Sequence, residues 1–324
     1  ENIRWVVTAM IMGKETLMMA DTAQPQPRLK HVQCLGSGGL HRMAYWEWGD
    51  AANPRVLVCV HGLSRQGRDF DTLATALCGD YRVVCPDVVG RGQSEWLKDP
   101  MGYQIPVYAG DMLALLAQLQ PQTLDWVGTS MGGLIGMVLA GQPDLPLPVR
   151  IRRLVLNDVG PVVRWEALER IGTYLGQTGR FSSVQQAADA MAAISAGFGP
   201  HTPEQWLELS RPMVRPVAGE EGVFTLHYDP AIAVPFRTLT RESAAQGEAM
   251  LWQLYDGIRA ETLLLRGAES DLLARDTAQA MCARGPKAHL VEFGAVGHAP
   301  TLIAEDQRDT VTGFLLRADA VSKG

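Results

Sequence analysis

The chain has 324 residues, of which 47% are hydrophobic and 20% charged, a composition typical of a globular protein with enough length for a large core. Its formal net charge of −6 argues against a nucleic-acid partner, and the absence of any run of eighteen apolar residues argues against a membrane-spanning helix. The five cysteines are scattered without a Cys-x-x-Cys pair. We therefore expect neither disulfides nor a metal site, and a reducing, cytoplasmic location.

The first twenty residues begin without Met and contain a short apolar patch after a single Arg. The weak basic start and the lack of a convincing cleavage site do not fit an export signal, so we interpret this stretch as an over-extended start or a remnant of cloning. Gln and Pro then alternate up to Pro27. We expect residues 1–28 to be a flexible lead and the folded domain to begin near Leu29.

Strands and helices alternate in the next part of the chain. A strand followed by a turn is predicted at 41–48, and continuous apolar runs predict buried strands at 55–60, 81–85, 123–127 and 153–157. Helical periodicity is present at 69–77, at 106–119 and directly after residue 131. Continuous apolar strands that alternate with helices are typical of a mostly parallel sheet covered on both faces.

The pattern changes after residue 160. Short helices joined by Gly and Pro are predicted at 165–175, 183–194 and 203–209. Alternation resumes with strands at 261–266 and 288–293 and helices at 275–283 and 304–316. The sequence therefore predicts an α/β core formed by residues 29–160 and 258–324, interrupted by a mostly helical insertion at 161–257.

The most informative motif lies between the strand at 123–127 and the helix that follows it. Gly128-Thr129-Ser130-Met131-Gly132 reads Gly-x-Ser-x-Gly in the strand–turn–helix context of a nucleophile elbow. Such a turn strains the backbone at the Ser, and side chains at the two glycines would clash with neighbouring elements. By itself the motif also fits a glycine-rich turn with an incidental Ser.

An acid and a base follow later strands in the expected order. Asp271 comes after the strand at 261–266, and His298 comes after the strand at 288–293. The carboxyl ends of parallel strands gather the active site of an open α/β sheet, so we expect Ser130 as nucleophile, His298 as base and Asp271 as the residue that orients the imidazole. Asp158, which follows the strand at 153–157, is the alternative acid.

A serine nucleophile also requires N–H donors for the oxyanion that forms during attack. We expect them to be the backbone N–H groups of Met131, at the start of the helix, and Leu63, in the loop after the strand at 55–60. His61 in that loop is interpreted as structural. Arg65 is interpreted as a solvated or paired cation, with an anionic substrate as the alternative.

Together these motifs resemble the α/β-hydrolase superfamily. The resemblance rests on His61-Gly62, Pro86-Asp87-x-x-Gly90-x-Gly92-x-Ser94, Gly128 to Gly133, Gly267-x-x-Ser270-Asp271 and Gly297-His298. It implies an eight-stranded, mostly parallel sheet and identifies the insertion as a cap over the site. It also implies that residues 86–94 are structural, and that the chain is a serine esterase that works through an acyl-enzyme, without metal or cofactor.

The substrate expected from this resemblance is a small-molecule carboxylic ester or a related acyl compound. Haloalkane dehalogenases and epoxide hydrolases share the fold, but Ser130 argues against both because their nucleophile is Asp. Three alternatives remain open: a carbon–carbon bond hydrolase of ring-cleavage products, a cofactor-free perhydrolase or haloperoxidase, and a ligand-binding receptor on the same scaffold. Ala299-Pro300 after the His disfavours the first, because those hydrolases usually carry a Trp there.

Overall fold

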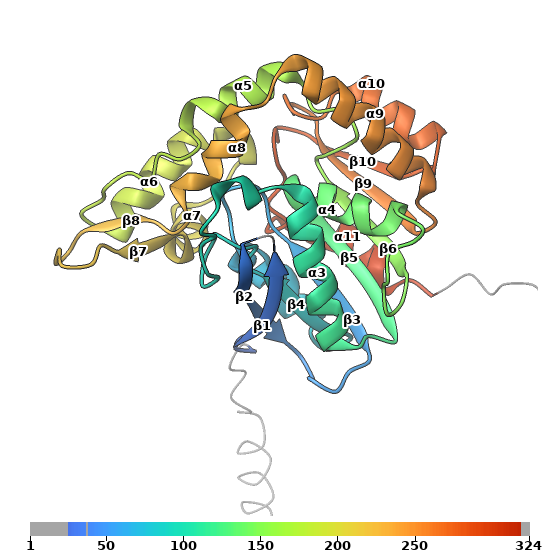
Figure 1. Cartoon of the computed structure of the whole chain (residues 1–324), viewed down its shortest axis with the longest axis horizontal. Helices are drawn as coiled ribbons and strands as arrows, with labels where there is room; N and C mark the ends of the chain where they lie inside the picture. Colours follow the sequence, from blue (N-terminus) through green and yellow to red (C-terminus); the bar gives the residue numbers. More distant parts are fainter. Residues whose placement is uncertain (1–24, 37, 319–324) are drawn as a thin grey trace, which may run out of the picture.

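The computed structural model describes residues 25–36 and 38–318. Within them, eight strands form one sheet in the order β1-β2-β4-β3-β5-β6-β9-β10 (Figure 1). These strands are β1 Arg28–Gly36, β2 Gly39–Trp48, β3 Arg55–Val60, β4 Arg82–Pro86, β5 Thr123–Thr129, β6 Ile151–Asn157, β9 Glu261–Gly267 and β10 His289–Phe293. Only the β1–β2 and β2–β4 pairs among them are antiparallel. The predicted fold class, a mostly parallel eight-stranded α/β sheet, is confirmed.

Strand β3 shows why the sheet is buried on both faces. Val56, Val58 and Val60 belong to one core cluster together with side chains of α3 (Ile105–Leu119) and α4 (Met131–Gly141). Leu57 and Cys59 belong to a second cluster, with α2 (Asp71–Leu77) and α11 (Glu305–Leu316). Successive side chains of a strand point to opposite faces, so a continuous apolar run supplies both clusters.

The stretch at 161–257 contributes no strand to the main sheet among the described residues. It holds two short strands, β7 (Val214–Pro216) and β8 (Phe224–Leu226), which form a separate two-stranded antiparallel sheet. Its helices are α5 Trp165–Tyr174, α6 Val184–Ile194, α7 Pro203–Ser210, α8 Ala233–Arg237 and α9 Arg241–Gly257. In Figure 1, α6 to α8 and the β7–β8 pair extend to the upper left of the sheet.

The last helix of this stretch, α9, packs on the core. A Cβ on Gly141, at the end of α4, would clash with the backbone of Leu254, and one on Gly257 would approach the carbonyl oxygen of Gly141. The two helices therefore touch backbone to backbone. The predicted limits of the cap, residues 161–257, stay a prediction; α9 lies within them and packs against α4 of the core. Helix α10, Arg275–Ala283, follows β9.

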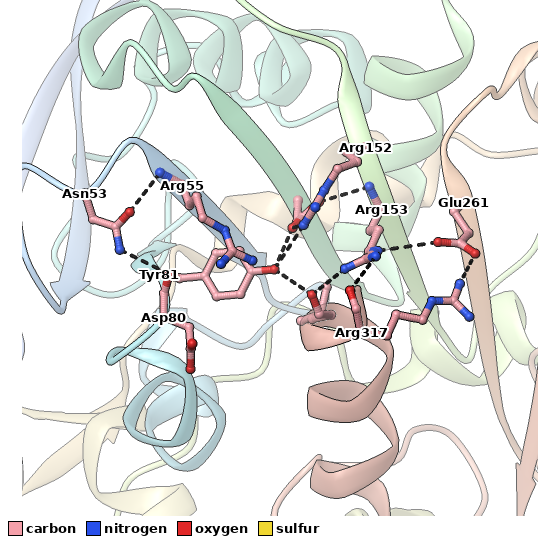
Figure 2. A network of polar contacts seen from close by, with 10 residues as sticks. Asn53, Arg55, Asp80, Tyr81, Arg152, Arg153, Glu261 and Arg317 are labelled. Atoms are coloured by element: carbon pink, nitrogen blue, oxygen red, sulfur yellow. Dashed lines mark hydrogen bonds and ion pairs between the residues drawn. The ribbon is translucent and has the colours of Figure 1, made fainter. Parts of the chain in front are cut away.

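A polar network closes the amino-terminal side of the sheet (Figure 2). Asp125, in β5, is fully buried and accepts hydrogen bonds from the Tyr81 hydroxyl at 2.7 Å and from Arg152 Nη2 at 2.6 Å. Arg153 Nη1 donates at 2.6 Å to the carbonyl oxygen of Leu315, at the end of α11. The network thus fastens the last helix to the amino-terminal ends of the strands.

The predicted flexible lead falls almost entirely on residues 1–24, which lie outside the described residues; β1 begins at Arg28. Among the residues that are described, no helix is long and apolar enough to cross a membrane.

Candidate active site

Ser130 lies in a strained turn between β5 and α4. Its backbone has φ 51° and ψ −115°, a positive-φ conformation that residues with a side chain rarely adopt. The flanking glycines permit this turn. A Cβ on Gly128 would clash with the backbone at Gly132, and one on Gly132 would clash with the carbonyl oxygen of Val60 in β3. The predicted elbow geometry is therefore present at this position.

His298 brings the serine and an acid together. Its Nε2 lies 3.0 Å from Ser130 Oγ, and its Nδ1 lies 2.7 Å from Asp158 Oδ2. Because a carboxylate can only accept, Nδ1 carries the proton and donates to Asp158, which leaves Nε2 as the acceptor for the Ser130 hydroxyl. This is the tautomer that a general base next to a serine requires.

Asp158 is held from three directions at the end of β6. It is fully buried, with φ 54°, and besides His298 it accepts from the backbone N–H of Gly267 at 2.9 Å and from Ser270 Oγ at 2.6 Å. The backbone N–H groups of Leu272 and Leu273 donate to that same Ser270 oxygen. The loop after β9 thus fixes the carboxylate that faces His298.

The prediction that Asp271 orients His298 is wrong, because Asp158 is the carboxylate that contacts the imidazole. The Asp271 side chain is 51% exposed and forms an ion pair with Arg170 of α5 at 2.8 Å. The physical reason is strand order: β6 lies between β5, which carries the serine, and β9, so the acid after β6 lies nearer to the nucleophile. Ser270, the neighbour of Asp271 in the predicted motif, contacts the acid instead.

The two predicted oxyanion donors stay predictions, and both occupy suitable places. Met131 is the first residue of α4, where a backbone N–H has no partner inside the helix. Leu63 lines the pocket that also contains Ser130, and its carbonyl oxygen accepts from the Nε of Arg91 at 2.8 Å. Arg91 is fully buried, so it fixes the backbone at Leu63.

His61 is part of the scaffold under this loop, as interpreted from the sequence. Its Nδ1 donates to the carbonyl oxygen of Gly62 at 2.7 Å, and its Nε2 accepts from the backbone N–H of Val88 at 3.0 Å. Complete burial, with Arg91 and Arg65 adding a smaller effect, lowers the pKa of His61 to about 3. The ring is therefore neutral and serves as a hydrogen-bonded spacer.

A pocket of about 660 Å³ opens over Ser130 and His298, within the range of roughly 300–1,000 Å³ usual for small-molecule sites. Its floor is formed by the loops after β3, β5, β9 and β10, and its walls come from α5, α6, α7 and β8. The segment at 161–257 therefore covers the serine without contributing Ser130, His298 or Asp158.

One stretch of that cover touches the histidine loop directly. Gly297 N–H donates to the carbonyl oxygen of Gly197 at 2.6 Å, and His201 Nε2 lies 2.7 Å from Thr301 Oγ1. The other ring nitrogen of His201 donates to the carbonyl oxygen of Gly199 at 2.9 Å. The loop that carries His298 is thus held on one side by the covering segment, through Gly197 and His201, and on the other by the core, through Asp158.

Comparison with known proteins identifies the family. The model of the alpha/beta hydrolase family matches residues 57–312. A 3-hydroxybutyrate-oligomer hydrolase from Cupriavidus necator is 57% identical over 278 residues, which cover 86% of this chain and 94% of that protein. A crystal structure of an alpha/beta hydrolase from Novosphingobium aromaticivorans is 38% identical, with a TM-score of 0.77, and covers 91% of this chain and 99% of its own.

The chain belongs to the alpha/beta hydrolase family. The resemblance predicted from the sequence is thereby confirmed, and so is the prediction of a hydrolase.

One group of potential metal ligands lies elsewhere in this alpha/beta hydrolase. Cys34, His41 and Asp111 are buried together where β1, β2 and α3 meet. His41 Nε2 lies 3.0 Å from both oxygens of Asp111, so the ring nitrogen that would have to bind a metal is hydrogen-bonded to the carboxylate instead. Burial and the nearby Asp111 carboxylate raise the pKa of the Cys34 thiol, which keeps it protonated. These contacts are those of a hydrogen-bonded core cluster.

Proposed function

We propose that this chain hydrolyses the ester bonds of short oligomers of 3-hydroxybutyrate or of closely similar hydroxy acids, with Ser130, His298 and Asp158 as the catalytic triad. The observation that carries the chemistry is the continuous hydrogen-bonded chain from the Ser130 hydroxyl through His298 to the buried Asp158, open to a pocket at its serine end. The substrate class rests on the 57% identity to the Cupriavidus necator hydrolase, because that similarity extends over nearly the full length of both proteins.

The proposed reaction has two halves. In the first, His298 Nε2 takes the proton of the Ser130 hydroxyl while Oγ attacks the ester carbonyl carbon. The tetrahedral intermediate then collapses, the bond to the alcohol oxygen breaks, and His298 returns the proton to that oxygen. In the second half, a water molecule repeats the attack on the acyl-enzyme, and the acid is released with Ser130 restored. Asp158 stabilises the imidazolium in both halves.

The negative charge on the carbonyl oxygen needs donors that are in place before the reaction. In the proposal the N–H groups of Leu63 and Met131 supply them. The support is positional: the Leu63 backbone is fixed by buried Arg91, and the Met131 N–H lies at the positive end of α4. Losing one such donor costs about 3–4 kcal/mol of transition-state stabilisation in related serine enzymes.

The cap over the site and the free cysteines fit the same function. Residues 161–257 act as the cap that shapes the pocket, supported by the lining contributed from α5, α6, α7 and β8. All five cysteines lie among the described residues and are free thiols, which fits a reducing compartment such as the cytoplasm. No cofactor is required by this mechanism.

The direct test measures cleavage of 3-hydroxybutyrate dimer, trimer and tetramer by chromatography, beside p-nitrophenyl esters of increasing chain length. We expect turnover of the oligomers, and we expect Ser130→Ala to reduce kcat by at least about three orders of magnitude while the fold is kept. Ester cleavage by Ser130→Ala within tenfold of the native rate would contradict the assignment.

The alternative activities are tested on the same purified protein with other substrates. A vinylogous diketone tests for carbon–carbon bond hydrolysis, and peroxide with a short carboxylic acid tests for perhydrolysis. A receptor would be labelled at Ser130 by a fluorophosphonate yet show negligible turnover on every substrate. Oligomer cleavage that exceeds the turnover of each alternative substrate is the outcome that we expect.

A further inference from the structure

The pocket has two chemically different sectors. Side chains from α6, α7, the turn directly after α7 and β8 form an apolar sector: Met191, Ile194, Leu209, Met213 and Leu226. The other sector carries Arg170 and Tyr174 of α5, with Glu269 and Asp271 from the loop after β9. An oligomer of 3-hydroxybutyrate has matching chemistry, since methyl-bearing ester units end in one free carboxylate. Its two ends can therefore be distinguished by these sectors.

Of the pocket cations, Arg170 is the one whose partner can be exchanged. The Nε and Nη2 of Arg65 donate to different oxygens of Asp69, at 2.7 and 2.6 Å. Its Nη2 also donates to the carbonyl oxygen of Leu209, and the Arg65 side chain is 13% exposed. The Nε and Nη2 of Arg170 both lie 2.8 Å from a single oxygen of Asp271, and the Arg170 side chain is 45% exposed. A half-exposed pair of this kind is weakly held and open to competition from another anion.

The position of Asp271 relates Arg170 to the leaving group. Asp271 directly follows Ser270, whose hydroxyl donates at 2.6 Å to the same Asp158 oxygen that faces His298 Nδ1. The loop with Asp271 therefore runs beside the acid and the base. Since His298 delivers the proton to the departing alcohol oxygen, the alcohol part of the ester leaves on this side of the pocket.

We propose that Arg170, assisted by the hydroxyl of Tyr174 one helical turn along α5, binds the free carboxylate at the acid end of the oligomer, and that Asp271 holds the guanidinium in place when the pocket is empty. This rests on the function proposed above. The carboxyl-terminal unit then lies on the leaving-group side and the remaining chain in the apolar sector. A guanidinium with five donors can orient a carboxylate through two parallel hydrogen bonds.

The acidic residues of this pocket sector determine whether removing the Asp271 charge raises or lowers the KM of the free-acid oligomer. Asp271 pairs with Arg170 and Glu269 lines the same pocket, so an incoming carboxylate must displace Asp271 and is repelled by these acidic side chains while it does so. Neutralising Asp271 removes a competitor. The Asp271→Asn variant is therefore expected to bind the free-acid oligomer more tightly, with a KM lowered about threefold or more, within the usual range for one half-exposed charge.

The experiment compares three forms of one trimer: the free acid, its methyl ester, and the free acid with an acetylated hydroxyl end. We expect kcat/KM of the first and third to exceed that of the methyl ester. Arg170→Gln should reduce the acid-to-methyl-ester ratio about tenfold, the range of one lost charge-assisted hydrogen bond. Arg180→Gln is the matched control, because it removes one charge from the same part of the chain, where Arg180 pairs with Glu220.

A second measurement does not depend on oligomer turnover. With a neutral p-nitrophenyl ester as substrate, 3-hydroxybutyrate should inhibit competitively, and Arg170→Gln should raise its inhibition constant about tenfold relative to Arg180→Gln. Added salt should weaken the inhibition in the native protein, because the subsite is partly exposed.

The outcomes separate the two proposals. An unchanged acid-to-ester ratio in Arg170→Gln, or an equal fall in Arg180→Gln, overturns the carboxylate subsite while oligomer hydrolysis stands. If no form of the trimer is cleaved above the Ser130→Ala background, the proposed function fails. In that case an inhibition constant that depends on Arg170 still supports the subsite, and one that does not overturns it as well.

Discussion

The two ends of the sheet each bury an aspartate, and the difference between them separates chemistry from architecture. At the amino-terminal end, Asp125 accepts from Tyr81 and Arg152, and the network continues through Arg153 to a backbone carbonyl of α11 (Figure 2). At the carboxyl-terminal end, Asp158 accepts from three groups, one of which is the ring of His298.

The partners of the two carboxylates explain their different roles. The network at Asp125 continues through Arg153 to Glu261 and Arg317 (Figure 2), none of which lines the pocket. Burial with the adjacent Asp125 raises the pKa of Tyr81 to about 12, so the tyrosine remains a hydrogen-bond donor. His298 instead presents its second nitrogen to Ser130 and to the pocket. A buried carboxylate thus supports catalysis only where the residue it binds has a second polar atom directed at the nucleophile and the pocket, as His298 has in Nε2.

The largest effect that tests this comparison is expected at Asp158. Asp158→Asn should lower kcat for a neutral p-nitrophenyl ester by about three to four orders of magnitude, because an amide at this position favours the wrong tautomer of His298. The measurement is steady-state kinetics, with circular dichroism to establish that the variant is folded.

Asp271→Asn serves as the paired variant. With the same neutral ester it should lower kcat by less than about tenfold, since its carboxylate faces Arg170 and not His298. If the two variants exchanged these effects, Asp271 would be the acid and the side-chain arrangement at His298 described here would be incorrect.

A stability effect is expected at the opposite end of the sheet. Asp125→Asn should destabilise the protein by about 2–4 kcal/mol, since removing a fully buried carboxylate leaves Arg152 and Tyr81 without their charged acceptor. Urea unfolding monitored by tryptophan fluorescence gives the free energy of unfolding. The ester kcat/KM of the folded variant should stay within about threefold of the native value. A loss of activity as large as that of Asp158→Asn would remove the distinction between the two ends.

The sequence was sufficient where the chemistry depends on neighbouring residues. The strand–turn–helix at Ser130 and the position of His298 after a late strand could both be predicted, because an elbow requires small residues at fixed distances from the serine. The acid could not be decided in this way. Asp158 and Asp271 both follow buried strands, and only the long-range order β5-β6-β9 brings Asp158 to the imidazole.

Elements with little buried apolar surface were missed altogether. Strand β1, at the edge of the sheet, buries only Val32 and Cys34, so its apolar pattern is weak. Helix α9 buries only Tyr255 and approaches α4 through glycine backbone, which gives no apolar stripe to detect. The short β7–β8 pair has no fully buried residue. Hydrophobic periodicity does not register these contacts, because it reports buried side chains.

The smallest expected effect is a pH dependence of the free energy of unfolding that arises from His61. His61, at the carboxyl-terminal end of β3, has a pKa of about 3 in the folded protein against 6.5 for an unperturbed histidine, because burial disfavours its charged form. Between those two values the unfolded chain binds a proton that the folded protein does not, so the free energy of unfolding falls as the pH falls below 6.5. The loss reaches about 2 kcal/mol at pH 5, from about 1.4 kcal/mol per unit.

His61→Gln isolates this contribution, since a glutamine can donate to the Gly62 carbonyl and accept from the Val88 N–H without titrating. Urea unfolding of both proteins at pH 7.5, 6 and 5 gives the difference between their stabilities, in which the titration of other groups cancels. We expect the native protein to lose about 2 kcal/mol relative to the variant between pH 7.5 and pH 5. Parallel stability curves would mean that His61 takes up a proton in the folded state. The loop that carries Leu63 would then rest on a charged ring and not on the neutral spacer.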